Sequence, residues 1–199
     1  MHHFLLASGL AALLLAGAMP AAQAQTPPKR PDFPKIDKSP LDAAWLPRDA
    51  VFREKPGDPV PAARILYSRP MKNGRKIFGP DTTFLVPYGQ VWRTGANEAV
   101  ELRVYRAITL GGKALKPGTY ALFTIPGEKE WTVIVSSDTE RWGAYSYSPK
   151  QDVARIPAVV RPAAEPQEAF AIAFRDDAPG KATLRLTWDT VEATVPVTY

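Results

Sequence analysis

The sequence predicts an all-β protein: an antiparallel β-sandwich of about eight or nine strands. Two observations support this fold class. Apolar and polar residues alternate in several short stretches, which is typical of strands with one buried face, and no stretch of ten or more residues keeps a helical period. Turn-forming glycines and prolines separate these stretches at short intervals, as they do in sandwiches and barrels. A jelly-roll-like barrel is the nearest alternative.

The first strands are predicted in the middle of the chain. Residues 98–106 alternate, with valine and leucine on one side and charged or aromatic residues on the other, so they predict a half-buried strand. Residues 119–125 and 131–135 are continuous apolar runs rich in β-forming residues. Because residues 126–130 between them include a Pro-Gly pair, the two runs predict a central hairpin.

The period of two returns three times before the C-terminus, in residues 170–174, 184–188 and 191–197. Glycine-containing segments at 111–113 and 178–181 predict further turns between strands. The predicted β-sandwich domain therefore spans residues 63–199.

The N-terminus predicts export from the cytoplasm. Residues 4–19 are an apolar stretch, and Ala22-Gln23-Ala24 has the small-x-small form that a signal peptidase accepts, so residues 1–24 are predicted to be a signal peptide. The stretch is shorter than the about 20 apolar residues of a bilayer span. The product is expected to be periplasmic or secreted, and not membrane-spanning after cleavage.

Residues 25–62 predict a proline-rich extended leader, because they contain nine prolines and almost no periodic apolar pattern. Proline fits neither a helix interior nor a central strand. Within this leader, residues 41–46 are expected either to form one helical turn or to dock Trp45 on the domain.

Composition excludes several kinds of chemistry. The only histidines, His2 and His3, lie in the predicted signal peptide, and there is no cysteine. Serine or cysteine triads, His or Cys zinc sites and His general bases therefore do not fit the mature chain, and we expect no cofactor and no metal. The net charge of +5 comes from scattered residues, which indicates a solvated basic surface and no nucleic-acid partner.

Residues 86–98 are the most unusual segment, since Gly89 and Gly95 bracket a Trp-Arg pair just before a predicted strand. Glycine permits positive φ or close approach, so a bent loop is expected to present polar and aromatic side chains. The candidate ligand-binding residues of this segment are Tyr88, Gln90, Trp92, Arg93, Asn97 and Glu98. The alternative is structural: Trp92 is a core aromatic, and Arg93 pairs with Glu98 to fix the loop.

Trp142 and Tyr145 are further candidates for ligand binding. Carbohydrate-binding sandwiches use exposed aromatic platforms, because each ring offers apolar area and keeps a polar tip. The alternative is that both rings fill the core.

Several segments together resemble a known family. They are residues 75–79, 85–99, 115–126, 130–134, 142–145 and 152–155. The chain is similar in these segments to the bacterial domain of unknown function DUF2911, from about Ala63 to the C-terminus. The resemblance implies an exported envelope protein and assigns no activity.

Three functions follow from these residues. The first is non-catalytic binding of a carbohydrate or another envelope glycan by the sandwich. The second is a protein-interaction or structural module of the envelope that uses a sheet edge or the leader. The third is a hydrolase with Glu98 as one of two carboxylates and Asp81, Asp138, Glu140 or Asp152 as the other. The sequence leaves the oligomeric state open.

Overall fold

The computed structural model describes residues 33, 35–58 and 60–199, and one compact unit comprises residues 36–199. The predicted signal peptide lies outside the described residues. In the part of the chain that is described, no helix has the length and apolar character needed to cross a membrane.

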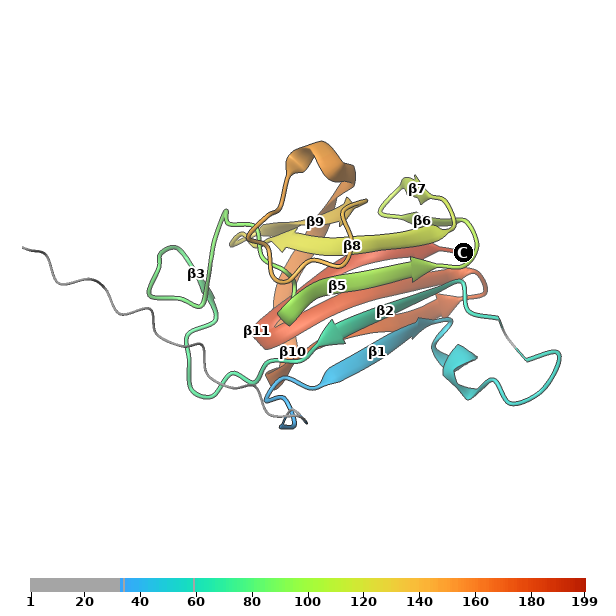
Figure 1. Cartoon of the computed structure of the whole chain (residues 1–199), viewed down its shortest axis with the longest axis horizontal. Helices are drawn as coiled ribbons and strands as arrows, with labels where there is room; N and C mark the ends of the chain where they lie inside the picture. The colour runs from blue at the N-terminus through green and yellow to red at the C-terminus, as the bar shows by residue number, and fades with distance from the viewer. Residues whose placement is uncertain (1–32, 34, 59) are drawn as a thin grey trace, which may run out of the picture. The chain divides into compact units, whose positions relative to one another are not determined.

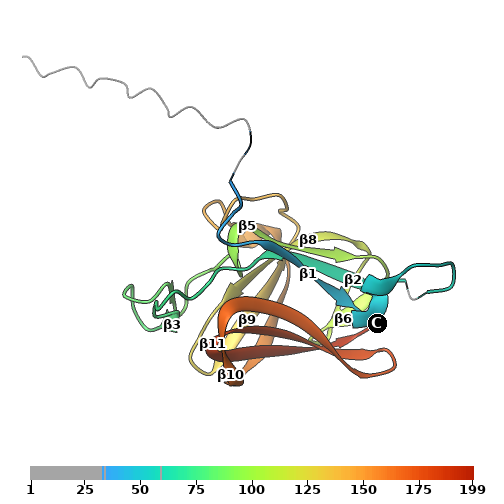
Figure 2. The ribbon, with the colours of Figure 1, turned by 90° about the horizontal axis from the view of Figure 1, so that it is seen from below.

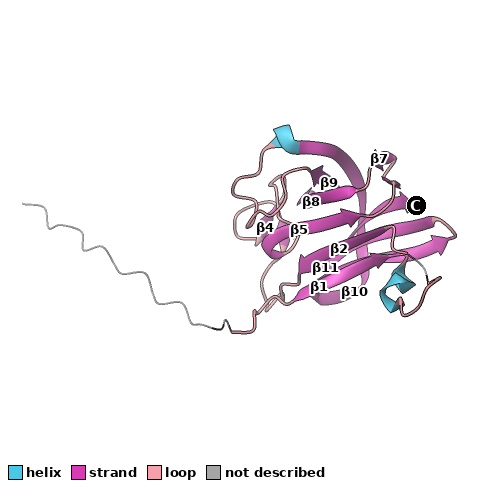
Figure 3. Ribbon diagram, turned by 45° about the vertical axis from the view of Figure 1, so that its right-hand side comes forward, coloured by secondary structure: helices cyan, strands magenta, loops and turns pink. Residues whose placement is uncertain are grey.

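The regular secondary structure of the described chain consists of β-strands and two short 3₁₀ helices (Figure 3). The elements are β1 (Leu41–Leu46), η1 (Arg48–Phe52), β2 (Ala63–Ser68), β3 (Phe78–Gly79), β4 (Val86–Pro87), β5 (Ala96–Val104), β6 (Ile108–Leu110), β7 (Lys113–Leu115), β8 (Gly118–Ile125), β9 (Glu130–Ser136), η2 (Pro149–Gln151), β10 (Asp152–Ala178) and β11 (Lys181–Thr198).

Nine strands form one antiparallel sheet in the order β1-β2-β5-β8-β9-β10-β11-β6-β7, and β3 pairs with β4 in a small parallel sheet. The large sheet folds over, so that β10 and β11 lie beneath β1, β2 and β5 (Figures 1 and 2). Because β1 and β7 stand at the two ends of the order, the sheet is not a closed barrel. The prediction of an antiparallel β-sandwich is confirmed.

The predicted central hairpin is β8 with β9, in the register Leu122↔Val135. The predicted strand at residues 98–106 is β5, whose alternate residues Val100, Leu102 and Val104 are buried. The turn at 178–181 connects β10 to β11 as predicted.

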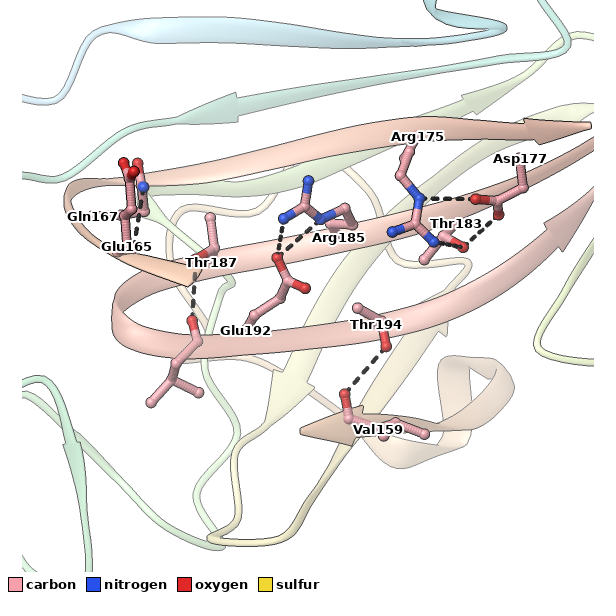
Figure 4. Close-up of polar contacts among 11 residues, drawn as sticks. Val159, Glu165, Gln167, Arg175, Asp177, Thr183, Arg185, Thr187, Glu192 and Thr194 are labelled. Atoms are coloured by element: carbon pink, nitrogen blue, oxygen red, sulfur yellow. Dashed lines mark hydrogen bonds and ion pairs between the residues drawn. The ribbon is translucent and has the colours of Figure 1, made fainter. Parts of the chain in front are cut away.

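The last two strands are longer than the sequence pattern predicts, because β10 and β11 bend without ending. β10 pairs first with β9 and then with β11, and two of its register shifts lie between Pro162 and Ala171. Such bulges let a strand bend and change its twist. β11 bends at Asp189, where φ is +54°. Across this bend Arg185 and Glu192 of the same strand form an ion pair (Figure 4).

The helical turn expected over Leu41–Leu46 is wrong. This segment is β1, and all six of its residues pair with β2. Ala44 and Leu46 point into the core, while Trp45 is half-buried with the guanidinium of Arg64 5.6 Å from its ring centroid. Only two residues of this segment are buried in alternation, and such a short pattern between prolines is not recognised in the sequence. The compact unit begins at residue 36, well before residue 63.

The core between the two layers centres on five large aromatic side chains: Phe78, Trp92, Trp131, Phe170 and Trp188. Trp92 and Trp188 are stacked, with ring centroids 5.9 Å apart and planes inclined by 16°. Phe170 meets both of these rings edge-on, at 5.1 and 5.9 Å. Edge-to-face pairs add a modest favourable term to the burial of apolar area, so this cluster joins β10 and β11 to the loop before β5.

A smaller apolar cluster lies on the other face of the strands β5, β8 and β9. Its buried members are Ala99, Ala121, Phe123 and Ile134. Ala144 and Tyr147, from the loop between β9 and η2, pack against it. This loop therefore has an apolar support of its own.

Tyr67 predicts how stability depends on alkaline pH. Its hydroxyl donates to the carbonyl of Ile172 (3.1 Å), and burial raises the pKa of the phenol above its ordinary value. A raised pKa in the folded state means that the stability contributed by the neutral phenol is complete below about pH 10 and is lost as pH rises through the folded value.

We therefore expect the melting temperature to fall less between about pH 9 and pH 11.5 in Tyr67→Phe than in the unmodified protein. At neutral pH the variant should be about 1 kcal/mol less stable, since the carbonyl of Ile172 loses its donor. Tyr145→Phe, whose ring is 85% exposed, is the matched control. Parallel pH profiles for Tyr67→Phe and the unmodified protein would contradict this assignment.

Candidate functional site

The loop between β4 and β5 bends as the two glycines predict, and each glycine acts in a different way. Gly89 has a φ of +77°, which favours a residue without a side chain. Gly95 has no positive φ, but a Cβ there would lie 2.8 Å from the carbonyl oxygen of Ser68. Close approach of β2 explains the second glycine.

Trp92 fixes this loop to the sandwich. Its backbone N–H donates to the carbonyl of Thr124 (2.7 Å), and the N–H of Thr124 donates back (2.9 Å). Its indole Nε1–H donates to the carbonyl of Gly95 (3.2 Å), so the loop is closed on itself. The side chain is only 9% exposed, as the structural alternative expects for a core aromatic.

Arg93 and Asn97 line the same cavity of about 430 Å³, which we call the arginine pocket. Its other lining residues are Ser39, Pro70, Arg75, Leu85, Val86, Trp92, Gly95, Ala96 and Trp188. This lining contains two arginines, and no Asp or Glu is among the described residues that form it. The cavity lies within the volume range of small-ligand sites.

The guanidinium of Arg93 forms no ion pair with a carboxylate among the described residues. Its Nε atom is buried and has no hydrogen-bond partner in the part of the chain that the structure describes. The ion pair with Glu98 that the structural alternative requires is not formed among the described residues. Buried polar atoms normally find partners, so this nitrogen is an exception that needs an explanation.

Asp37, just before β1, lies beside Asn97. The carboxylate accepts the backbone N–H of Ser39 (2.6 Å). That hydrogen bond, with a second one from the side chain of Asn97, lowers the pKa of Asp37 below its ordinary value. Asn97 itself has a φ of +57°, in the left-handed region that asparagine tolerates better than most residues.

Glu98 follows Asn97 in β5 but lines a different cavity. This second cavity, of about 200 Å³, is called here the glutamate cavity. It is lined by Leu41, Leu66, Glu98, Ala99, Val100, Glu101, Tyr120, Ala121, Thr139 and Glu140. Arg93, Asn97 and Glu98 therefore do not share one pocket.

Of the carboxylates proposed as partners of Glu98, the structure brings only Glu140 into the same cavity. Asp81 accepts hydrogen bonds from Thr83 within its own turn, and Asp138 pairs with Arg141 at 2.8 Å. Asp152 is engaged by Tyr147 and Arg155, as described below. A hydrolase would thus rest on Glu98 and Glu140.

Trp142 and Tyr145 lie on the protein surface, and their side chains are 67% and 85% exposed. The alternative that they fill the core is wrong. Trp142 forms a backbone β-bridge with Glu98, and the N–H of Gly143 donates to the carbonyl of Asn97 (3.0 Å). Both rings therefore belong to a loop that is joined to β5 beside the glutamate cavity.

A polar network holds the far end of this loop. The hydroxyl of Tyr147 donates to the carboxylate of Asp152 (2.8 Å), and Arg155 donates to both Asp152 (2.7 Å) and that hydroxyl (2.7 Å). Burial, followed by the hydrogen bond to Asp152, raises the pKa of Tyr147. Since the ring of Tyr147 also packs edge-on against Phe123, the loop is fixed by both polar and apolar contacts.

The remaining candidates lie outside both cavities. Tyr88 is half-buried against the core, and Gln90 is exposed on the loop. Sequence reasoning missed Ser39, Arg75 and Trp188 as pocket residues. Arg75 lies in residues 75–79, one of the segments that resemble DUF2911, and this resemblance could have indicated it. No local pattern indicates that Trp188, a strand residue, borders a cavity.

The fold and these two cavities define a β-sandwich domain with a cationic pocket and an acidic cavity close to its central strand. The described residues contain no group of three or more Asp, Glu or His side chains arranged to hold a metal ion. The family model described as "Protein of unknown function (DUF2911)" matches residues 59–197. The chain belongs to this family, and the resemblance read from the sequence is confirmed. No curated protein and no solved structure matched the chain.

Proposed function

We propose that this protein is a non-catalytic, carbohydrate-binding β-sandwich whose ligand is an envelope glycan. The observation that carries the proposal is the exposure of Trp142 and Tyr145 on a fixed loop. Large aromatic side chains are seldom left this exposed. Exposed rings on a backbone that is held in place are suited to stack against the C–H face of a sugar.

The neighbouring carboxylates supply the polar half of such a site. Glu98 and Glu140 line the glutamate cavity, and neither has an ion-pair partner among the described residues, whereas Glu101 pairs with Arg64 at 3.3 Å. Free carboxylates accept hydrogen bonds from hydroxyl groups. A ligand that offers both apolar faces and hydroxyl donors matches this combination, and sugars have both.

The rigidity of the loop supports recognition by stacking. Its two ends are held by hydrogen bonds to β5 and by the network of Tyr147, Asp152 and Arg155. A loop whose backbone is already ordered loses little conformational freedom when a ligand binds, which favours affinity. If the predicted signal peptide directs export, the protein is placed in the compartment where glycans of the periplasm or the cell exterior occur.

Removing either exposed ring should weaken glycan binding about tenfold without affecting the fold, because stacking contributes about 1 kcal/mol per ring and the burial of the ring adds to it. We expect this result for Trp142→Ala and for Tyr145→Ala, measured by calorimetric titration with peptidoglycan fragments and neutral oligosaccharides. Tyr105→Ala, whose ring is 39% exposed on another part of the surface, is the matched control and should bind as the unmodified protein does.

Two outcomes would overturn the proposal. One is a panel of these glycans that leaves both the melting temperature and the heat signal of the unmodified protein unchanged. The other is unchanged affinity in Trp142→Ala and Tyr145→Ala alike.

A further inference from the structure

We propose that the arginine pocket is a second binding site, specific for an oxyanion: the carboxylate or phosphate group of a small ligand. This inference does not depend on glycan binding, since the arginine pocket and the glutamate cavity share no lining residue. Asn97 and Glu98 are neighbours in β5, yet each lines a different cavity.

The charge of the pocket selects the class of ligand. Arg75 and Arg93 both line it, and the described lining residues include no acid that would neutralise them. Arginine is always charged, and its planar fork of donors fits carboxylate and phosphate oxygens. A ligand with two or three oxygen acceptors and a negative charge therefore matches this lining best.

The unpaired Nε of Arg93 is the second observation. This atom is buried and lacks a hydrogen-bond partner in the described chain, and Arg93 is one of the residues that line the pocket. An N–H donor in this position is satisfied when an oxyanion accepts from it, and hydrogen bonds between ionised groups are the strongest of this kind.

Arg75 is oriented before any ligand arrives. Its Nε–H donates to the carbonyl of Lys72 (3.0 Å), and its Nη2 donates to the carbonyl of Met71. These bonds to the backbone hold the guanidinium in place and leave its remaining N–H groups for another acceptor. A donor that is already fixed loses less freedom on binding.

The apolar part of the pocket strengthens this attraction. Trp92 and Trp188 line the pocket and are 9% and 1% exposed, so little water reaches that side. Charge–charge attraction rises as water is excluded. The two indoles also provide an optical signal from within the pocket.

Asp37 is positioned to compete with the ligand. Its carboxylate lies beside the side chain of Asn97, a lining residue of the pocket, and that amide contributes to lowering the pKa of Asp37. An incoming oxyanion needs that same amide donor and is repelled by the negative charge beside it. Removing this carboxylate should therefore tighten binding.

The test is a fluorescence titration of the full mature chain in a Trp142→Phe background, which removes the signal of the exposed indole. The probes are inorganic phosphate and acetate, with chloride at equal ionic strength as the reference. We expect a saturable change with at least one probe. Arg93→Gln should weaken it about tenfold or more, since a hydrogen bond between charged groups is lost. Asp37→Ala should strengthen it about two- to fivefold.

Arg103→Gln is the matched control, because Arg103 is exposed on β5 and donates to Thr119 away from the pocket. It should bind like the parent. Arg93→Lys keeps the charge without the fork, and a melting temperature within about 2 °C of the parent shows that a loss of binding is not unfolding. A response to phosphate alone or to acetate alone identifies which oxyanion the pocket takes.

The proposal is overturned if neither probe gives more change than chloride, or if Arg93→Gln and Arg93→Lys, both folded, bind as tightly as the parent. Neither result affects the glycan site, which is tested by Trp142 and Tyr145.

Discussion

Replacing Phe170 with alanine is expected to lower the free energy of unfolding by about 3–5 kcal/mol, the usual cost of removing a buried phenylalanine. The side chain is fully buried and meets Tyr67, Trp92 and Trp188 edge-on. These three partners come from β2, the loop before β5, and β11. No other single ring in the core contacts these three segments with aromatic pairs among the described residues.

Urea denaturation measures this effect as a lower midpoint with an unchanged slope. The matched control is Phe52→Ala, the same substitution at a ring that is 73% exposed, which should change stability by no more than about 0.5 kcal/mol. Equal losses in the two variants would show that the core is not arranged around Phe170.

Substituting alanine for Gly111 should destabilise the protein by about 2–5 kcal/mol, for two reasons that add. The residue has a φ of +54°, which is strained for any residue with a Cβ. An added Cβ would also lie 2.2 Å from Cγ2 of Ile156 and 3.1 Å from Cγ1 of Val195, two fully buried side chains. Overpacking of this kind costs about 1–3 kcal/mol in addition to the strain.

Gly112 separates the two causes. Its φ is +80°, but nothing lies within 4 Å of a Cβ built there. Gly112→Ala should therefore show the conformational cost alone, about 1–2 kcal/mol, and thermal or urea unfolding of both variants gives the difference. If Gly112→Ala were as destabilising as Gly111→Ala, contact with Ile156 would not be the reason for the glycine.

Strands that alternate and pair with their neighbours in sequence were predictable. β5 follows from the period of two, whereas β8 and β9 follow from their continuous apolar runs and the turn between them. The sequence offers no comparable signal for β1. It lies among prolines, and its partner β2 is distant enough that only the folded sheet reveals the pairing.

The long strands were harder to predict for a different reason. A local pattern shows where alternation stops, as it does near Asp189, but it does not show whether the chain turns back or bends and continues. β11 continues, and Arg185 and Glu192 meet across the bend.

For the candidate site, the motif in residues 86–98 identified the right loop but not its geometry. Composition cannot show that Asn97 has a positive φ and that Glu98 then lines a cavity other than the arginine pocket. Nor can it show that Arg75 lies close enough to share a pocket with Arg93, because that proximity depends on the fold around β3 and β4. The sequence allowed two interpretations of Trp142, an exposed platform or a core residue, and the exposed fraction of its side chain, 67%, supports the first.

The continuity of β10 and β11 has a consequence for how the molecule comes apart. β10 pairs with β9 at one end and packs under β1 and β2 at the other, where Tyr67 donates to Ile172. A force or a denaturant that separates either layer must therefore disrupt the contacts of both β10 and β11. Residues 36–199 should melt in a single transition, with calorimetric and van't Hoff enthalpies that agree.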